Sequence, residues 1–475
     1  MITEIAWKNV WRNRTRSLIV ITAVTIGVFA GVFTIAAMNS SVVQRIDSAI
    51  NEELSHIQIN TKDFRKSGDI KSIIPDYSQV VATVDTVPGV SAVTGRIVLR
   101  GIAATAAKSA GVEIDGIDPE KEKQIFTLYK KLIPGTGTYF GTKTKLGEAF
   151  IGEKLARDLD IIRYILTPEA LSNLGHERVP SGVISKLEPL KDQRFVTERK
   201  LSQAYEPLLT PSEIKRYGMK IKDAAWSYRK DSKIILSFLD ANNVETSAAF
   251  RVTGIFRINN TMFEEGHVFV PLEELRQLTG LKSGQFQRII VKLDNNNLTD
   301  RVTEEIREDF PHLEVLSWKE IQPDLALLSD MMQMIYGIFM AIILAALAFG
   351  IVNTMLMAVL ERTREIGMLA AIGMNRKKIF LMIMLESVFL SITGGISGMA
   401  VGGAVIALTA RHGINLVRYS EGLEAFGYSA HLYPTINAEF FVITTLLIVL
   451  TGIISSIYPA RKALKLNPVE ALRGE

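Results

Sequence analysis

Four long apolar runs constrain this chain more than any other feature of its sequence. Leu18–Met38, Met331–Leu360 and Phe440–Tyr458 contain no charged residue, and Ile379–Ala410 contains only Glu386. The hydrocarbon core of a bilayer is about 30 Å thick and is crossed by about 20 helical residues, so each run is long enough to span it. A mean hydropathy of +0.20 for the whole chain agrees with this interpretation. We therefore expect four transmembrane helices, at residues 18–44, 329–360, 379–410 and 439–458.

The first apolar run resembles a signal peptide at its start and a membrane anchor in its length. Lys8, Arg12, Arg14 and Arg16 give it a basic flank. Its uncharged stretch of 21 residues exceeds the roughly 7–15 of a signal-peptide core, and no small-x-small cleavage site follows. We interpret it as an uncleaved anchor, preceded by a cytoplasmic amphipathic helix at residues 1–17.

Lysine and arginine residues near the ends of the runs predict the orientation, because cytoplasmic flanks are enriched in them. Four lie before the first run, five lie in residues 361–378 and four follow the fourth run. The connection at residues 411–438 holds only Arg411 and Arg418. We therefore expect a bacterial inner-membrane protein with both termini cytoplasmic. The segments expected in the cytoplasm are 1–17, 361–378 and 459–475, and those expected in the periplasm are 45–328 and 411–438.

Residues 45–328 are predicted to form one large α+β domain. The segments at 55–112 and 286–318 each follow the pattern of strand, helix, proline-bearing turn and strand. We expect these two β-α-β halves to pack together, with residues 113–285 as a second lobe inserted between them. The predicted fold class is a membrane protein with four transmembrane α-helices and a large α+β extracytoplasmic domain between helices 1 and 2.

Residues 161–230 differ in composition from the rest of the inserted lobe. They contain five prolines and many charges but few sustained apolar periods. Such a segment is either a loosely ordered surface insertion or a protruding arm that contacts a periplasmic partner. The sequence favours neither interpretation over the other.

The sequence lacks the motifs of a catalytic subunit. It has no Gly-Lys dipeptide and therefore no P-loop, and neither H-E-x-x-H nor G-x-S-x-G occurs. The six histidines are scattered, which favours structural roles over metal ligation, and the absence of cysteine excludes disulfides and thiolate metal sites. A net charge of +4, concentrated at membrane edges, gives no reason to expect nucleic-acid binding. We expect a non-catalytic subunit without a metal or cofactor of its own.

The segment "ERTREIGMLAAIGMNRKKIF", residues 361–380, lies between the second and third runs. Its apolar residues recur at helical spacing, and its acidic residues come early and its basic residues late, as the helix dipole favours. Gly373 and Asn375 then offer a turn. We expect a short cytoplasmic helix at residues 361–378, which either lies in the lipid headgroups or docks in a groove on a soluble partner.

This segment resembles the E-R-x-x-E-I-G-x-L-x-A-I-G signature of the FtsX-like, MacB-like permeases of ABC transporters. Further matches are "AWKNVWRNRTRSLI" before the first run, "SHIQI" after it, "GIDPE" and "IGEKLARDLDI" in the large domain, and "YPARKALKLNPVEALRGE" at the end. The resemblance covers the chain except residues 161–230, where the family has a short strand. The chain has no fused nucleotide-binding domain of the MacB kind, which implies a separate ATPase subunit.

The resemblance implies mechanotransmission. Two permeases, identical or homologous, would pair in the bilayer, and closure of a cytoplasmic P-loop ATPase dimer, which holds ATP and Mg²⁺, would move their MacB-like periplasmic domains. By motif match, the residues implied at the ATPase interface are Glu361, Arg362, Glu365, Ile366, Gly367, Leu369, Ala371, Ile372 and Gly373.

Among branches of the family, an unfused permease with a large outer domain most resembles the lipoprotein-releasing LolC and LolE type. The implied function is release of lipoproteins from the inner membrane to a periplasmic carrier. Three alternatives remain open: a MacB-like exporter of periplasmic peptides or drugs with an adaptor, an FtsX-like activator of a peptidoglycan hydrolase, and a membrane-anchored binding module without an energy source.

Two features within the third run have physical interpretations of their own. Gly394, Gly398 and Gly402 follow the small-xxx-small spacing that lets helices approach closely. They predict helix packing, either within one subunit or between two. Glu386 is a costly charge within a span, and it has either a pairing role or ordinary solvation at the membrane interface.

Overall fold

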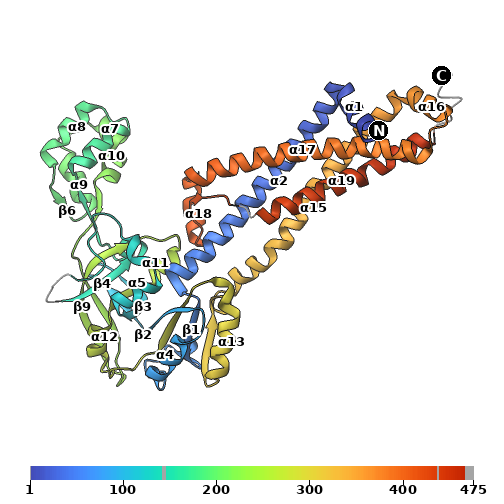
Figure 1. Ribbon diagram of the computed structural model, residues 1–475. Helices are drawn as coiled ribbons and strands as arrows, with labels where there is room; N and C mark the ends of the chain where they lie inside the picture. The colour runs from blue at the N-terminus through green and yellow to red at the C-terminus, as the bar shows by residue number, and fades with distance from the viewer. Residues whose placement is uncertain (1, 142–145, 436–437, 466–475) are drawn as a thin grey trace. The chain divides into compact units, whose positions relative to one another are not determined.

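The computed structural model describes residues 2–141, 146–435 and 438–465, which divide into two compact units (Figure 1). We call residues 1–45, 324–420 and 429–475 the membrane unit. We call residues 46–323 and 421–428 the sheet domain.

The membrane unit contains the long helices that the apolar runs predict. They are α2 (Arg14–Ser48), α15 (Pro323–Glu361), α17 (Arg376–His412) and α19 (Ala438–Leu464). Each is long and apolar enough to cross a membrane, so the four transmembrane helices of the predicted fold class are confirmed. Each helix also extends past its apolar run, because polar residues such as Arg14 and Ser48 continue the helical backbone.

Shorter elements connect these helices. They are α1 (Ile2–Arg12), α16 (Thr363–Ala371), β13 (Ile414–Asn415), a 3₁₀ turn (Val417–Tyr419), α18 (Ser420–Ala425) and β14 (His431–Leu432). The expectation of one helix over residues 1–17 is wrong, because the chain bends at Asn13 between α1 and α2. Part of two predicted segments lies outside the described residues, namely 436–437 of the periplasmic loop and 466–475 of the cytoplasmic tail.

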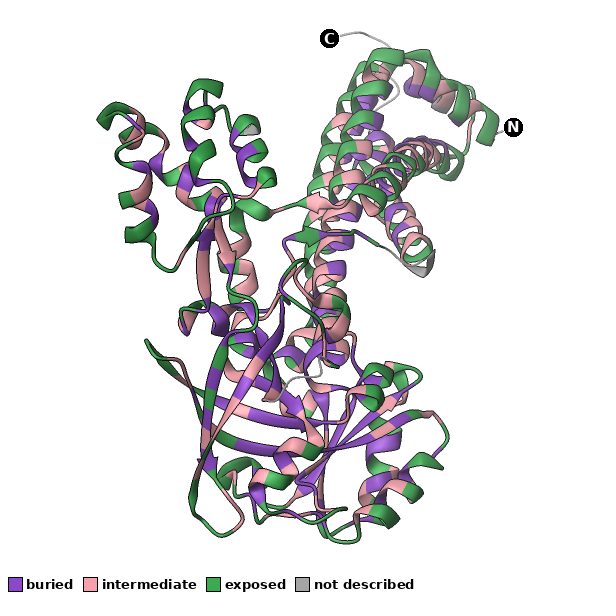
Figure 2. Cartoon of the chain, turned by 90° about the vertical axis from the view of Figure 1, so that its left-hand side faces the viewer, coloured by how far each residue is buried: buried purple, intermediate pink, exposed green. Residues whose placement is uncertain are grey.

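The core of the membrane unit is formed by one cluster of buried apolar side chains. Every long helix contributes, as do α1 and α16, through residues such as Val10, Val28, Ile351, Ile366 and Ile448. Large apolar side chains elsewhere on these helices stay exposed, as lipid-facing residues would, and Figure 2 shows these outward turns in green.

The sheet domain is built on nine strands in the order β12-β1-β11-β2-β3-β10-β4-β9-β8. The strands are β1 (Ile57–Thr61), β2 (Val90–Ala104), β3 (Ser109–Ile117), β4 (Gly147–Gly152), β8 (Lys233–Leu239), β9 (Glu245–Phe256), β10 (His267–Pro271), β11 (Arg288–Leu293) and β12 (Leu313–Ser317). β1 lies between β11 and β12 and runs antiparallel to both. The two β-α-β segments therefore interleave in one sheet, and α4 (Tyr77–Asp85) and α13 (Thr299–Asp309) share their core.

β2 joins this interleaved sheet to the rest of the domain. Its first half pairs with β11, and its second half pairs with β3 and β8. The closed path β2-β3-β10-β4-β9-β8-β2 makes a six-stranded barrel, whose interior holds Ile97, Ile114, Ile151 and Phe250. The expected second lobe at residues 113–285 is therefore not separate from the first, because one long strand belongs to both.

Short helices cover the ends and faces of these strands. They are a π-helical turn (Ala49–Leu54), α3 (Phe64–Ser67), α5 (Pro119–Ile125), α6 (Glu153–Asp158), α11 (Thr261–Gly266), α12 (Leu272–Thr279) and α14 (Trp318–Ile321), with 3₁₀ turns at Leu128–Lys131 and Asn296–Leu298. Successive side chains of a strand point to opposite faces of the sheet. The barrel interior is therefore apolar, and a second cluster of buried apolar side chains lies on another face of the strands.

Residues 161–230 form an ordered subdomain, so of the two interpretations of this segment, the loosely ordered insertion is wrong. It has a three-stranded sheet, β5 (Ile162–Ile165), β6 (Arg194–Phe195) and β7 (Trp226–Tyr228), and the helices α7 (Pro168–His176), α8 (Ser181–Leu187), α9 (Glu198–Tyr205) and α10 (Pro211–Ala225), with a 3₁₀ turn at Glu188–Leu190. Leu174, Leu187 and Leu201 are fully buried in its own core. Two of its prolines, Pro168 and Pro211, follow capping threonines at the first helical position, where proline favours a helix start.

Candidate coupling site

The segment singled out in the sequence folds as a short helix between two spans. α16 covers only Thr363–Ala371 of the expected 361–378, because the chain turns at Gly373. Gly373 has a φ of +93°, which favours glycine. Asn375 then accepts a hydrogen bond from the backbone N–H of Lys377 at 2.9 Å and caps α17.

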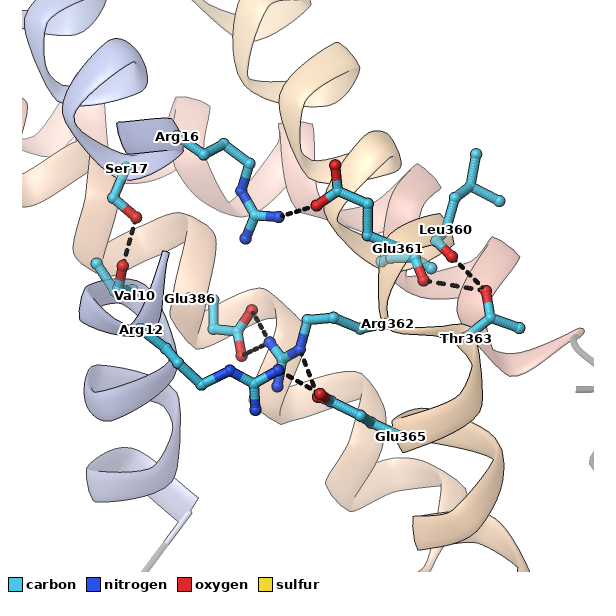
Figure 3. Close-up of polar contacts among 11 residues, drawn as sticks. Val10, Arg12, Arg16, Ser17, Leu360, Glu361, Arg362, Thr363, Glu365 and Glu386 are labelled. Carbon is cyan, nitrogen blue, oxygen red and sulfur yellow. Dashed lines mark hydrogen bonds and ion pairs between the residues drawn. The ribbon is translucent and has the colours of Figure 1, made fainter. Parts of the chain in front are cut away.

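The acidic residues of this segment contact arginines from the start of the chain (Figure 3). Arg12 of α1 donates a hydrogen bond to Glu365, and Arg16 donates to Glu361 at 3.1 Å. The Arg12 bond, and after it the bond from Arg362, hold the pKa of Glu365 below its usual value. Glu365 is thus charged at neutral pH and links α16 to α1.

Arg362 connects α16 to α17. Its Nε donates to Glu365 at 2.9 Å, and its Nη1 donates to both carboxylate oxygens of Glu386 at 3.2 and 3.4 Å. Asn9 of α1 donates to the same carboxylate at 2.6 Å. Glu386 is only 5% exposed. The interpretation of Glu386 as an ordinarily solvated residue at the membrane interface is therefore wrong, and the residue is a paired, buried carboxylate.

These contacts define a cluster that we call the coupling network: Asn9, Arg12, Arg16, Glu361, Arg362, Glu365 and Glu386. It ties together α1, α2, α15, α16 and α17. Sequence reasoning used Arg12 and Arg16 only to orient the chain and missed Asn9 altogether. The one available sign was that α1 is amphipathic and ends in arginine beside the first span.

The apolar residues assigned to the ATPase interface divide between two faces of α16. Ile366 is 6% exposed within the core of the unit, and Gly367 is also buried. Ile372 is 79% exposed, and Met368, which the motif match did not assign to the interface, is 49% exposed. The remaining assigned residues lie between or beside these, with Leu369 half-buried and Ala371 and Gly373 exposed. The exposed side of α16 is therefore apolar at Met368, and so is Ile372 just after the helix, while Glu365 near its start is held by ion pairs.

The three spaced glycines of α17 pack against α2 of the same chain. A Cβ at Gly394 would lie 2.7 Å from the Cβ of Val24, and one at Gly398 would lie 2.7 Å from the carbonyl oxygen of Thr25. At Gly402 the nearest atom, from Val32, is 3.5 Å away. Of the two predicted packing modes, the structure supports close approach within one subunit.

Among the described residues of the sheet domain, one group of side chains can ligate a metal. Glu113 and Asp115 of β3 and His267 of β10 place one ligand atom each within 4.8 Å of the others. Burial raises the pKa of Asp115, but its hydrogen bond with His267 and the charge of Arg96 lower it more, so it is ionised. Arg288 pairs with Glu113 at 2.8 Å. Both carboxylates thus have cationic partners, which compete with a metal. Sequence spacing missed this group because strand pairing brings it together.

Comparison with known proteins matches the C-terminal part of the membrane unit to a family. The model of the FtsX-like permease C-terminal family matches residues 337–468. The chain carries an FtsX-like permease domain. The matched segment contains α16, Glu386 and the three spaced glycines, so the coupling network lies largely within it.

Three curated relatives of this permease domain extend the match. An uncharacterized ABC transporter permease of Methanocaldococcus jannaschii is 30% identical over 48% of this chain and 55% of its own length. The macrolide export ATP-binding/permease protein MacB of Chlorobium luteolum is 32% identical over 48% of this chain and 29% of its own. The lipoprotein-releasing system transmembrane protein LolC of Xylella fastidiosa is 24% identical over 48% of this chain and 55% of its own.

The resemblance to FtsX-like and MacB-like ABC transporter permeases is thus confirmed over the matched segments, and the four long apolar helices indicate a membrane protein. The chain covers 55% or less of the length of these three relatives.

Proposed function

We propose that this chain is the permease subunit of an ABC transporter that works by mechanotransmission. A separate cytoplasmic P-loop ATPase dimer binds ATP and Mg²⁺, and this chain converts its closure into movement of the sheet domain without catalysing a reaction itself. The match to the FtsX-like permease domain supports this function.

The coupling network is the observation that carries the proposal. At the start of α16, Glu365 and the preceding Arg362 make charged hydrogen bonds to α1 and α17, while Met368 in the helix and Ile372 just past its end are exposed. Charge-assisted hydrogen bonds are roughly twice as strong as neutral ones. A push on the exposed end is therefore passed to several helices together.

This geometry revises the roles proposed for the motif residues. Glu361, Arg362 and Glu365 act as positioning residues, because each is already paired within the chain. The direct ATPase contact falls to Met368 and Ile372, with Ala371 and Gly373 beside them. An amphipathic helix that presents such anchors to a groove is a common mode of recognition.

The orientation follows the distribution of basic residues. We place both termini and α16 in the cytoplasm and the sheet domain in the periplasm of a bacterial inner membrane. A second permease, identical or homologous, completes the transporter within the lipid bilayer.

Lipoprotein release is the transport function we favour, with a periplasmic carrier receiving the cargo. The matched relative LolC supports it. Export of periplasmic peptides or drugs through an adaptor is the second candidate, because the MacB relative matches at the higher identity of 32%.

The experiment is purification of the tagged full-length chain in mild detergent, followed by mass spectrometry of what accompanies it. A P-loop ATPase with lipoproteins or a carrier supports lipoprotein release, and a homologous permease in the sample identifies the pairing. An ATPase with an adaptor supports export, and one with a peptidoglycan hydrolase supports an FtsX-like activator. Recovery of the chain without any ATPase contradicts the proposed function.

A further inference from the structure

A cavity of about 140 Å³ lies beside strands β2, β3 and β11 of the sheet domain, and positive charge dominates its lining. Its charged lining residues are Arg65, Arg100, Arg288 and Glu113, three cations against one carboxylate. A site for a single water needs about 10–15 Å³, so this cavity has room for a larger polyatomic group. Nothing in the coupling network or in the proposed transport cycle uses it.

Arg288 is held in place at one side of the cavity. Its Nη1 donates to Glu113 at 2.8 Å, and its Nε donates to the side-chain oxygen of Asn60 at 3.4 Å. Its guanidinium lies over the ring of Phe64, 5.8 Å from the ring centre, and its side chain is 12% exposed. A guanidinium fixed in this way loses little conformational freedom when it binds a ligand.

Arg100 is held at the other side without being neutralised. Its Nη2 donates to the carbonyl oxygen of Arg65 at 2.9 Å, and its Nη1 donates to that of Lys66 at 3.4 Å. Carbonyl groups satisfy hydrogen bonds but carry no net charge. Gly68, with a φ of +62°, makes room for this arrangement, because a Cβ there would lie 2.8 Å from the Nε of Arg100.

The largely buried Arg288 and the exposed Arg65 and Arg100 give the cavity a net charge of two positive units after Glu113 is counted. A cation is repelled by such a lining, and a carboxylate balances only half of it. A phosphate group carries up to two negative charges and offers several oxygens to planar guanidinium forks.

We propose that this cavity is a binding site for a phosphate group, with Arg100 and Arg288 as its walls and Arg65 at its rim. The group belongs either to a free phosphate compound or to a phospholipid headgroup, since both present the same oxyanion. The site is independent of the function proposed for the coupling network.

The test is a calorimetric titration of the full-length chain in detergent, first with inorganic phosphate and then with glycerol 3-phosphate as a headgroup probe. We expect saturable binding of inorganic phosphate, at least as tight as that of glycerol 3-phosphate if the ligand is free phosphate. Tighter binding of glycerol 3-phosphate also supports the site and assigns its source to a headgroup.

Arg65→Gln and Arg100→Gln are each expected to weaken binding about tenfold or more, because each removes a hydrogen bond to a charged group. Arg65 is exposed, so its substitution does not threaten folding. Arg199→Gln, an exposed arginine of α9, is the matched control and is expected to bind as the unsubstituted chain does. Failure to bind either compound at millimolar concentration, or equal affinity in Arg65→Gln, Arg100→Gln and Arg199→Gln, would overturn the proposal.

Discussion

Two arginines of this chain each lie between two carboxylates, one in each unit, and the comparison separates a structural role from a coupling role. Arg96 of β2 donates to both oxygens of Glu122 at 2.8 Å and lies 3.6 Å from Asp115. Arg362 lies 2.9 Å from Glu365 and 3.2 Å from Glu386. The charges are the same, but the elements they join are not.

The Arg96 cluster belongs to one closed core. Its side chains come from β2, β3 and α5, and the rings of Phe126 and Phe269 lie 4.7 and 5.5 Å from the guanidinium carbon. The Arg362 cluster instead connects separate helices at one end of the membrane unit, and Arg362 keeps 16% of its side chain exposed. We infer that the first cluster holds a domain together and that the second transmits movement between helices.

The largest effect should come from Arg96→Ala. It leaves Glu122 buried without its cation and leaves Asp115 with His267 but without Arg96, and breaking a buried pair from one side costs about 3–5 kcal/mol. Hydrogen exchange of the β2 and β3 backbone amides in the full chain measures the loss of unfolding free energy. Arg199→Ala serves as the exposed control. A loss below about 1 kcal/mol would mean that the cluster does not stabilise the domain.

Glu386→Gln should loosen the membrane unit without unfolding it. The substitution removes the charged partner of Arg362, and such hydrogen bonds contribute about 1.5–3 kcal/mol. Because the chain has no cysteine, spin labels at the exposed positions Lys8→Cys and Arg364→Cys report the distance between α1 and α16 alone. We expect a broader distance distribution than in the doubly labelled parent.

The matched control is Glu361→Gln, whose carboxylate is 45% exposed. An exposed ion pair contributes about 0–1 kcal/mol, so this variant should leave the distance distribution nearly unchanged. If Glu361→Gln broadened the distance distribution as much as Glu386→Gln, the buried Glu386 would not differ from the exposed Glu361 in how it holds α1 and α16 together.

Glu264 is a buried carboxylate that, unlike those beside Arg96 and Arg362, accepts hydrogen bonds from backbone N–H groups. The donors are Ile258 at 2.6 Å and Lys154 at 3.3 Å. Burial raises its pKa to about 7, and the nearby charge of Glu153 adds to the shift. The stability gained from neutral Glu264 is thus complete below about pH 4.5 and is lost as the pH rises through about 7. We expect a contribution of about 3 kcal/mol.

The pH dependence is measured by hydrogen exchange or thermal unfolding of the sheet domain in the full chain between pH 5 and 8, with rates corrected for intrinsic exchange. Glu264→Gln removes this titration and should flatten the curve. An unchanged pH profile in that variant would exclude Glu264 as its source.

The smallest effect is expected from Gly398→Ala in the membrane unit. The added Cβ meets the Thr25 carbonyl oxygen at 2.7 Å, and overpacking costs about 1–3 kcal/mol, partly offset by the better helix propensity of alanine. We expect a net loss of about 1 kcal/mol in thermal stability in detergent. Gly402→Ala, which meets only an ordinary contact at 3.5 Å, should be neutral. The opposite order would mean that Gly398 does not pack on α2.

The sequence predicted the membrane unit better than the sheet domain, for a physical reason. Spans depend on local composition, so the four apolar runs gave the four helices, and Gly373 and Asn375 gave the turn after α16. The barrel depends on pairings such as β2 with β8, which join distant residues and leave no local trace. The same limit hid the partners of Glu386, because Asn9 lies 377 residues away in sequence.

The prolines of residues 161–230 show a second limit. Their number left a loosely ordered insertion open beside a protruding arm, although Pro168 and Pro211 begin helices behind capping threonines. Composition alone could not distinguish an ordered subdomain from a loosely ordered insertion. The order of threonine followed by proline could have done so, because it is typical of a helix start.

The most direct test of coupling is to measure how much ATPase co-purifies with the tagged full-length chain and with its Met368→Asp and Ile372→Asp variants. Both side chains are exposed, so the substitutions should leave the fold and the label distance between α1 and α16 unchanged. The account predicts that the ATPase is lost from both variants and retained by the control variant Leu408→Asp. Leu408 is exposed too, at 62%, but lies near the C-terminal end of α17. Retention of the ATPase by Met368→Asp and Ile372→Asp would contradict the docking of α16.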